Sequence, residues 1–575
     1  MIARPAAGPD APRMQPPPLV DRVGGASQPR PGETPPPAAP PTATAQPPVA
    51  LVAFHGMGQQ VRYGTIEDAV DQLERGARAA GGAVTLRGRT QHVDNGQLVA
   101  CAELELALPD RAPQRVDVYE AYWAPLTEGR ISTWQTFVFL LSAAADGVVD
   151  GVASGFRFRR YLFRRDPPQA DLFRTSFATV LGLALAAGVI AGLWVFEVVM
   201  LAVVGSGVLL GREPAWFAAI RTVLFADYSG LLCGLGAGTL AFVVLPALLA
   251  PLRRRAPDAC RALAWVCDAG LVVAALGTVL VALDVVVLCA LAAAAPGHAS
   301  PLAALEPLRR VAHAWIGIVG GMAGQRGWLL AWGLALAFVS LRVRLFLRQY
   351  LGDVAIYVSS HKVDRFYETR VAVQKAAVDV LRFVFGRADA GGSASYGRVV
   401  LMGHSLGSVI AYDALNRVIL EDAAAATPVN VCGRASALVT YGSPLDKIAF
   451  VFRTQRRGAG TLREAMAASR QPLIENTAAR QLWWINLYSP FDWIGGRLDY
   501  YDRPNELVPG VRPVINLEDP HALTPLLAHG EHDKGTLLPS VVTSAAAGTL
   551  GLDTDVLKGL EREQERRRRA PGTPR

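Results

Sequence analysis

The sequence predicts an α/β protein, a mostly parallel sheet flanked by helices, that is interrupted by an α-helical transmembrane block. Residues 49–54 (VALVAF) and 398–402 (RVVLM) are short apolar runs, and each leads directly into a glycine-containing turn, HGMG at 55–58 and GHSLG at 403–407. Such runs are typical of strands buried on both faces of a parallel sheet. Between the two strands lie long apolar stretches, which predict helices that cross a membrane.

The composition indicates a protein that is partly embedded in a membrane. Of 575 residues, 51% are hydrophobic and only 18% are charged, whereas about a quarter of the residues of a soluble domain are charged. The length predicts two or more structural units. The net charge of +8 does not indicate a nucleic-acid partner, because the arginines lie beside the apolar runs and not on one compact domain.

The six cysteines show no paired spacing, which predicts reduced thiols and neither a disulfide framework nor a zinc site. The sequence also contains no P-loop and no dinucleotide-binding fingerprint. We therefore expect no cofactor and no metal.

Five segments are expected along the chain. Residues 1–48 contain 15 of the 39 prolines and few large apolar groups, so they are interpreted as a disordered leader. Residues 49–165 form the first part of the sheet domain, residues 166–348 the transmembrane block of about four helices, and residues 349–550 the second part of the sheet domain. Residues 551–575 form a charged, basic tail.

Four apolar runs predict the transmembrane helices: Ser176–Gly211, Ser229–Ala250, Leu263–Ala295 and the shorter Trp328–Leu341. A helix needs about 20 apolar residues to span the hydrocarbon core. Arginine clusters precede the first run, separate the second from the third and follow the fourth, so both flanks are cytoplasmic by the positive-inside rule. We expect an integral, multi-pass membrane protein whose sheet domain and both termini are cytoplasmic.

The strands at 49–54 and 398–402 flank the membrane block, so the number of crossings must be even if both belong to one sheet. Three acidic residues, Glu197, Asp268 and Asp284, lie within the apolar runs, where a charge costs about 2.5–3.5 kcal/mol at mid-bilayer. A transport role for these residues and a simple anchoring role for the block are both open, and anchoring is favoured.

Local patterns predict the other elements of the sheet domain. A helix is expected near 66–79, a hairpin over 85–106 and a strand at 115–119. After the membrane block, apolar residues at helical spacing predict a helix within 363–385, and a further helix is expected at 408–420, directly after the second turn.

The turn at 403–407 has the form G-x-S-x-G between a strand and a helix. A serine that ends a strand and begins a helix must adopt a strained backbone conformation, and Gly403 and Gly407 let the two elements approach closely. The hydroxyl of Ser405 is then exposed above the sheet, at the positive end of the helix. An ordinary glycine-rich strand–helix turn is the alternative.

With this turn, the chain resembles the α/β-hydrolase superfamily, in particular its lipases and esterases, over residues 49–125 and about 350–545. The resemblance implies a nucleophile elbow made of Gly403, His404, Ser405, Leu406 and Gly407. The strand ending LVTYGSP at 438–444 is similar to the one that follows the elbow in this family.

The resemblance also implies the other catalytic groups. The segment WWINLYSPFDWIGG places Asp492 just past the next strand, where the family has its catalytic acid. The backbone N–H of Leu406 and the turn at Gly56 and Met57 would form the oxyanion hole.

The catalytic base is expected in the late segment DPHALTPLLAHGEHDKG, which contains His521, His529 and His532. His529 is favoured because AHGEH resembles the short histidine loop of the family, and His532 and His521 stay open as alternatives. His404, inside the elbow, is interpreted as a packing residue.

These residues together predict a membrane-anchored serine hydrolase that cleaves carboxylic esters through a Ser-His-Asp triad. Lipid esters are the favoured substrates, because the resemblance is to lipases and the bilayer is near. Two alternatives stay open: an acyltransferase with the same triad, and a membrane scaffold or transport protein that carries an inactive hydrolase fold. The expected partners are a lipid or ester small molecule and the bilayer, with no nucleic acid.

Overall fold

The computed structural model describes residues 47–142, 181–192, 229–249, 256–293, 353–357, 366–448, 471–501 and 512–569, with short gaps inside several of these ranges. The leader expected at 1–48 falls almost wholly outside the described residues. So do most of the apolar run at 176–211 and the whole of the run at 328–341.

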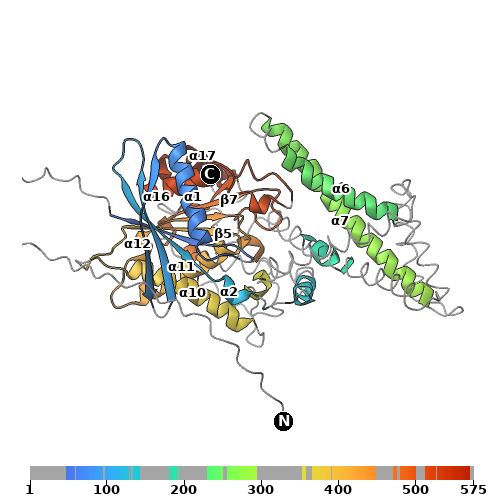
Figure 1. The fold of residues 1–575 in the computed structure, drawn as a ribbon, viewed down its shortest axis with the longest axis horizontal. Coiled ribbons are helices and arrows are strands. Elements are labelled where there is room, and N and C mark those ends of the chain that lie inside the picture. The colour runs from blue at the N-terminus through green and yellow to red at the C-terminus, as the bar shows by residue number, and fades with distance from the viewer. Residues whose placement is uncertain are drawn as a thin grey trace, which may run out of the picture. The chain divides into compact units, whose positions relative to one another are not determined.

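Eight strands form one sheet in the order β2-β3-β4-β1-β5-β6-β7-β8 (Figure 1). Their bounds are β1 Val49–Phe54, β2 Ala83–Asp94, β3 Gln97–Ala107, β4 Gln114–Ala121, β5 Arg398–His404, β6 Ala435–Tyr441, β7 Trp483–Tyr488 and β8 Ile515–Glu518. β3 pairs antiparallel with β2 and β4, and the other five pairings are parallel. The predicted α/β class with a mostly parallel sheet is confirmed.

β1 and β5 lie side by side at the centre of the sheet, although the predicted membrane block separates them in the sequence. Val49 pairs with Arg398 at one end of this contact and Phe54 pairs with Gly403 at the other. The prediction that these two strands share one sheet is confirmed.

Helices cover both faces of the sheet (Figure 1). The α-helices are α1 Gly64–Ala79, α2 Ala124–Thr127, α6 Ser229–Leu248, α7 Pro257–Ala293, α10 Tyr367–Gly386, α11 Leu406–Ala424, α12 Val431–Arg434, α15 Pro472–Glu475, α16 Leu537–Ala547 and α17 Thr554–Arg569. Three 3₁₀ turns are η4 Ala479–Gln481, η5 Ala528–Gly530 and η6 Leu550–Leu552.

The alternation of side chains along β1 divides the core into two layers. Ala50, Val52 and Phe54 belong to the core cluster that contains residues of α10 and α11. Their neighbours on the opposite face, such as Val49 and Leu51, belong to the cluster that contains residues of α1 and α16. Because both faces are covered, every residue of β1 is buried, which explains its continuous apolar sequence.

Three of the four apolar runs are helical where the structure describes them: the described residues within 181–192 of the first run, and the second and third runs, which form most of α6 and α7. One described stretch, Asp258–Leu280 within α7, is long and apolar enough to cross a membrane. The helices pack closely, since a Cβ on Gly270 of α7 would lie 2.5 Å from the ring of Phe242 of α6. The four-span arrangement and its orientation stay predictions.

Most of the expected charged tail is the helix α17. Val556 is fully buried and Glu563 is nearly so, and Glu563 forms a 2.6 Å ion pair with Arg497. A Cβ on Gly559 would meet Leu517 of β8, so this glycine lets the helix lie close to the edge of the sheet.

Candidate active site

Ser405 stands between β5 and α11 in a strained backbone conformation. Its φ of 52° and ψ of −126° lie in a region that side chains rarely adopt and that favours glycine. A Cβ on Gly403 would lie 2.6 Å from Cα of Ser408, and a Cβ on Gly407 would overlap the carbonyl oxygen of His55. Because the atoms in the way belong to the backbone, the close approach of strand and helix requires both glycines.

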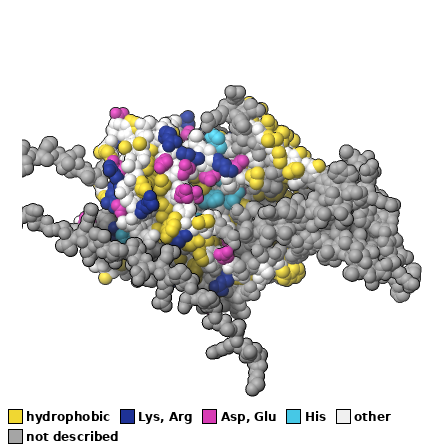
Figure 2. Space-filling model, in the orientation of Figure 1, with side chains coloured by type: hydrophobic (Ala, Val, Ile, Leu, Met, Phe, Trp, Pro, Cys, Tyr) yellow, Lys and Arg dark blue, Asp and Glu magenta, His cyan; other side chains and the backbone are white. Residues whose placement is uncertain are grey.

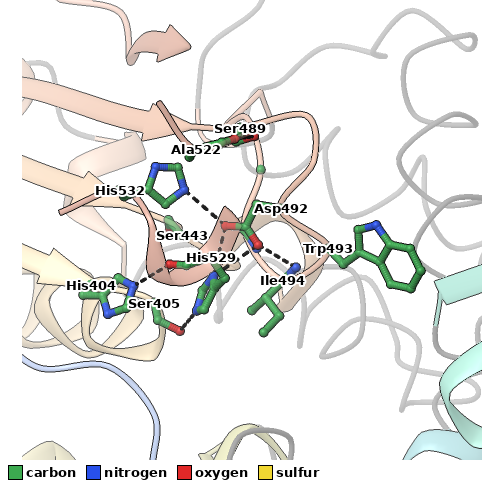
Figure 3. A network of polar contacts seen from close by, with 12 residues as sticks. His404, Ser405, Ser443, Ser489, Asp492, Trp493, Ile494, Ala522, His529 and His532 are labelled. Atoms are coloured by element: carbon green, nitrogen blue, oxygen red, sulfur yellow. Dashed lines mark hydrogen bonds and ion pairs between the residues drawn. The ribbon is translucent and has the colours of Figure 1, made fainter. Parts of the chain in front are cut away.

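Ser405, His529 and Asp492 form one hydrogen-bonded chain (Figure 3). Oγ of Ser405 lies 2.8 Å from Nε2 of His529, which is on η5. Nδ1 of the same ring lies 3.0 and 3.1 Å from the two carboxylate oxygens of Asp492, in the loop after β7. All three residues are at most 8% exposed. The fold thus brings together the three residues favoured from the sequence.

Backbone groups hold the Asp492 carboxylate in place. Its Oδ1 accepts hydrogen bonds from the N–H groups of Ile494 and Gly495, each at 2.8 Å. Nζ of Lys447 donates to the carbonyl oxygens of Trp493 and Gly495 in the same loop. Burial alone would raise the pKa of Asp492, but His529 and His532 outweigh it and hold the pKa well below its usual range. Asp492 is therefore ionised at neutral pH.

The alternative base, His532, lies on the other side of Asp492. Its Nε2 is 3.4 Å from Oδ2 of Asp492, and its Nδ1 is 3.1 Å from Oδ2 of Asp519. Burial alone would lower the pKa of His532, but the two carboxylates outweigh this effect and raise the pKa to about 9. His521, the third candidate, donates its backbone N–H to Asp519. Of the three, His529 is the one whose ring is hydrogen-bonded to Ser405.

His404 packs beneath this chain of residues. Its ring stacks between those of Tyr441 and His529, with centroid distances of 4.8 and 5.1 Å. Nε2 of His404 donates to the carbonyl oxygen of His529 at 3.1 Å, which ties the loop of His529 to β5. Burial, with a smaller contribution from His529, lowers the pKa of His404 to about 3, so the ring is neutral. This is the packing role expected from the sequence.

The turn after β1, predicted to supply part of the oxyanion hole, lies against the serine. A Cβ on Gly56 would be 2.7 Å from Nδ1 of His404 and 3.2 Å from Cβ of Ser405. The side chain of His55 points away into the core, where its Nε2 accepts the Trp123 N–H and its ring stacks on the indole. Burial lowers the pKa of His55 to about 4. His55 thus supports the turn from the side that faces the core.

The predicted oxyanion donors come from two different elements. Leu406 begins α11 directly after Ser405, and the first N–H groups of a helix have no acceptor within the helix. Gly56 and Met57 belong to the turn that abuts Ser405, and Met57 is buried. Both groups of predicted donors therefore flank the serine.

Asp353 is a site residue that sequence reasoning missed. Its buried carboxylate accepts the N–H of Gly58 at 2.8 Å and so fixes the far end of the 55–58 turn. Burial raises the pKa of Asp353 to about 6, against hydrogen bonds from Gly58 and Thr127. The two partners are 295 residues apart in the chain, so no local pattern indicates the contact. Asp519 is a second site residue that sequence reasoning missed, because it belongs to no recognisable motif.

Among the described residues, no group of three or more His, Cys, Asp or Glu side chains is arranged to hold a metal ion. No family model, curated protein or solved structure matches the chain. The function therefore has to be inferred from the chemistry of the site.

Proposed function

We propose that this chain is a serine hydrolase of the α/β-hydrolase fold that cleaves carboxylic esters. The observation that carries the proposal is the hydrogen-bonded chain from Ser405 through His529 to Asp492. The backbone strain at Ser405, which costs about 1–3 kcal/mol, supports it further, because glycine would avoid this strain in a purely structural turn.

The protonation of His529 follows from its two partners. Nδ1 faces the ionised carboxylate of Asp492 and carries a proton, so Nε2 presents a lone pair to the Ser405 hydroxyl. Nε2 takes the hydroxyl proton as Oγ attacks the ester carbonyl, and then gives it to the departing alcohol. Water, activated by the same ring, releases the acid from the acyl-enzyme. Asp492 stabilises the imidazolium throughout and stays ionised.

The oxyanion that forms in each half-reaction needs two N–H donors. We assign these to Leu406 and to the turn at Gly56 and Met57, which lie on either side of Ser405. The loss of one such donor typically costs about 3–4 kcal/mol of transition-state stabilisation. Asp353 would act indirectly here, since it anchors the N–H of Gly58 at the end of the turn.

Contacts between α7 and the Asp492 loop favour a lipid ester as substrate. Asp268 of α7 accepts a 2.6 Å hydrogen bond from Nε1 of Trp493, and Trp265 packs edge-on against Phe491 with centroids 5.0 Å apart. The loop that carries Asp492 is thus in direct contact with the helix predicted to enter the bilayer.

The length of α7 is compatible with this arrangement. Its 37 residues extend about 55 Å, and the hydrocarbon core is about 30 Å thick. The first turns would lie outside the bilayer against the Asp492 loop, and the apolar remainder would cross it. Trp265 and Trp493 are 52% and 40% exposed, and tryptophan is enriched at membrane interfaces. Leu240, Leu248 and Val266 of α6 and α7 are exposed, and Figure 2 shows a group of hydrophobic side chains at the upper right of the coloured surface.

The pairing of β1 with β5 supports an even number of membrane crossings between them. We propose four crossings with the sheet domain in the cytoplasm, as the arginine pattern predicts.

The proposal is tested by labelling isolated membranes with a fluorophosphonate probe, which reacts with activated serines. We expect the wild type to take the label, Ser405→Ala to lose it, and Asp492→Asn and His529→Ala to be strongly impaired. His532→Ala is expected to weaken the labelling. His92→Ala is the matched control, because His92 lies on β2 and contacts Arg387.

A folded wild type that takes no label would refute the hydrolase proposal and favour the scaffold or transport alternative. If the label is taken, the products formed from a lipid ester in vesicles, with and without an added alcohol, distinguish the two reactions. A hydrolase releases the free acid, whereas an acyltransferase, which forms the same acyl-enzyme, converts the added alcohol into a new ester.

A further inference from the structure

His532 is held between two buried carboxylates, beyond the three residues used above. Its Nε2 lies 3.4 Å from Oδ2 of Asp492 and its Nδ1 lies 3.1 Å from Oδ2 of Asp519. None of these three side chains is exposed to solvent. The hydrogen-bonded chain that begins at Ser405 therefore continues past Asp492 to Asp519.

The geometry determines the charge of His532. A neutral imidazole has one N–H group and one lone pair, so a neutral ring would direct its lone pair at one of the two carboxylates. Both carboxylates also accept backbone N–H groups, Asp492 from Ile494 and Gly495 and Asp519 from His521, which favours their ionised forms. Both contacts are then favourable only if both ring nitrogens carry protons.

We propose that His532 is a positioning residue, an imidazolium that holds the Asp492 carboxylate toward His529 and sets the charge that His529 experiences. This inference rests on the proposed hydrolase function. With His532 protonated, Asp519, His532 and Asp492 carry a net charge of −1, and the proton that His529 takes from Ser405 makes the cluster neutral. The imidazolium thus cancels one of the two negative charges that Asp492 and Asp519 place near His529.

Among the described residues, Asp492 and Asp519 face His532 directly, and Asp533 follows it in the chain. His529 and Lys447 interact with Asp492, His521 interacts with Asp519, and the neutral His404 lies close enough to interact with His532. Burial raises the pKa of Asp533, while Lys534, Arg75 and His532 act in the opposite direction. The two carboxylates that touch the ring therefore dominate its charge state.

Charge-changing variants test this role through the pH dependence of kcat/KM for an ester. His532→Gln removes the cation, so the group of side chains around Asp492 becomes more negative. We expect the acidic limb of the profile to move up by about one pH unit, with a lower kcat. Asp519→Asn should move the limb the other way, and the double variant, which restores the net charge, should return it close to the wild-type position. His92→Gln is the matched control.

A merely structural role would lower kcat in His532→Gln without moving the acidic limb, and that result would overturn the proposal. A second measurement does not need activity: nitrogen NMR of the histidine-labelled protein in detergent, with His532→Gln to assign the signal. We expect both ring nitrogens of His532 to be protonated at about pH 7.5. A neutral ring in an active enzyme would refute this inference alone, whereas an imidazolium in a folded chain with no esterase activity would refute the proposed function.

Discussion

The strain at Ser405 makes an unusual prediction: at this position, glycine should give a more stable protein than alanine. Ser405→Ala and Ser405→Gly both lose the hydroxyl and its 2.8 Å hydrogen bond to His529, so the difference between them isolates the backbone. Glycine relieves about 1–3 kcal/mol of strain at φ 52° and ψ −126°. It also gives the unfolded chain more freedom, which costs about 0.5–1 kcal/mol.

The net expectation is that Ser405→Gly is more stable than Ser405→Ala by about 0.5–2 kcal/mol. For a domain of this size, each kcal/mol corresponds to roughly 2–4 °C in Tm, which is measured by thermal unfolding of the purified protein in detergent. Ser408 is the control, because it is also fully buried but lies in helical backbone of α11. There, alanine should be more stable than glycine by about 1 kcal/mol. The same order of stabilities at both serines would refute the strain argument.

Three further predictions concern the surroundings of the site. Burial lowers the pKa of His55 from 6.5 to about 4 in the folded state. The free energy of unfolding should therefore fall by up to about 3 kcal/mol as the pH falls from about 6.5 to 4. Denaturant titrations at pH 7 and pH 5 should show a smaller fall for His55→Gln than for the wild type, and an equal fall in both proteins would contradict this prediction. For Asp353 the pH dependence has the opposite direction: its pKa is raised to about 6, so the free energy of unfolding falls as the pH rises from about 4 to 6. Asp353→Asn should raise the free energy of unfolding at pH 7.5 by up to about 3 kcal/mol and change it little at pH 4. A less stable Asp353→Asn variant at pH 7.5 would contradict this. Gly407→Ala should destabilise the fold by at least about 1–3 kcal/mol and abolish probe labelling, because its Cβ would overlap the carbonyl oxygen of His55. Gly386→Ala is the control, since a Cβ there meets nothing within 4 Å. Equal shifts in Tm for the two variants would show that α11 does not need to approach β1 so closely.

Those parts of the fold that have a local cause could be predicted from the sequence. β1 and the buried centre of β5 are recognisable because burial on both faces makes them apolar. The hairpin of β2 and β3 is recognisable because Asn95-Gly96, a sequence favoured in hairpin turns, stands between its two strands. β8 is only four residues long and was not predicted, since so short a strand shows no period. The packing of α17 was also missed, because its few apolar residues are spread among many charges.

In the site, the sequence could name the histidine candidates but could not choose between them. His529 and His532 are three residues apart, and both contact Asp492. They lie on different sides of the carboxylate, His529 toward Ser405 and His532 toward Asp519, and this placement depends on the path of the loop through η5. Asp353 and Asp519 escaped notice for a related reason: their partners are set by the tertiary fold.

The pairing of β1 with β5 also determines how late in synthesis the sheet can be completed. About 280 residues separate the end of β4 at Ala121 from the start of β5 at Arg398, and at about 5–20 residues per second their translation takes roughly 15–55 s. During this interval the nascent β1 has no β5 beside it, and an apolar strand with an open edge is prone to aggregate. The first half of the sheet therefore has to avoid aggregation with an incomplete edge until β5 has emerged from the ribosome.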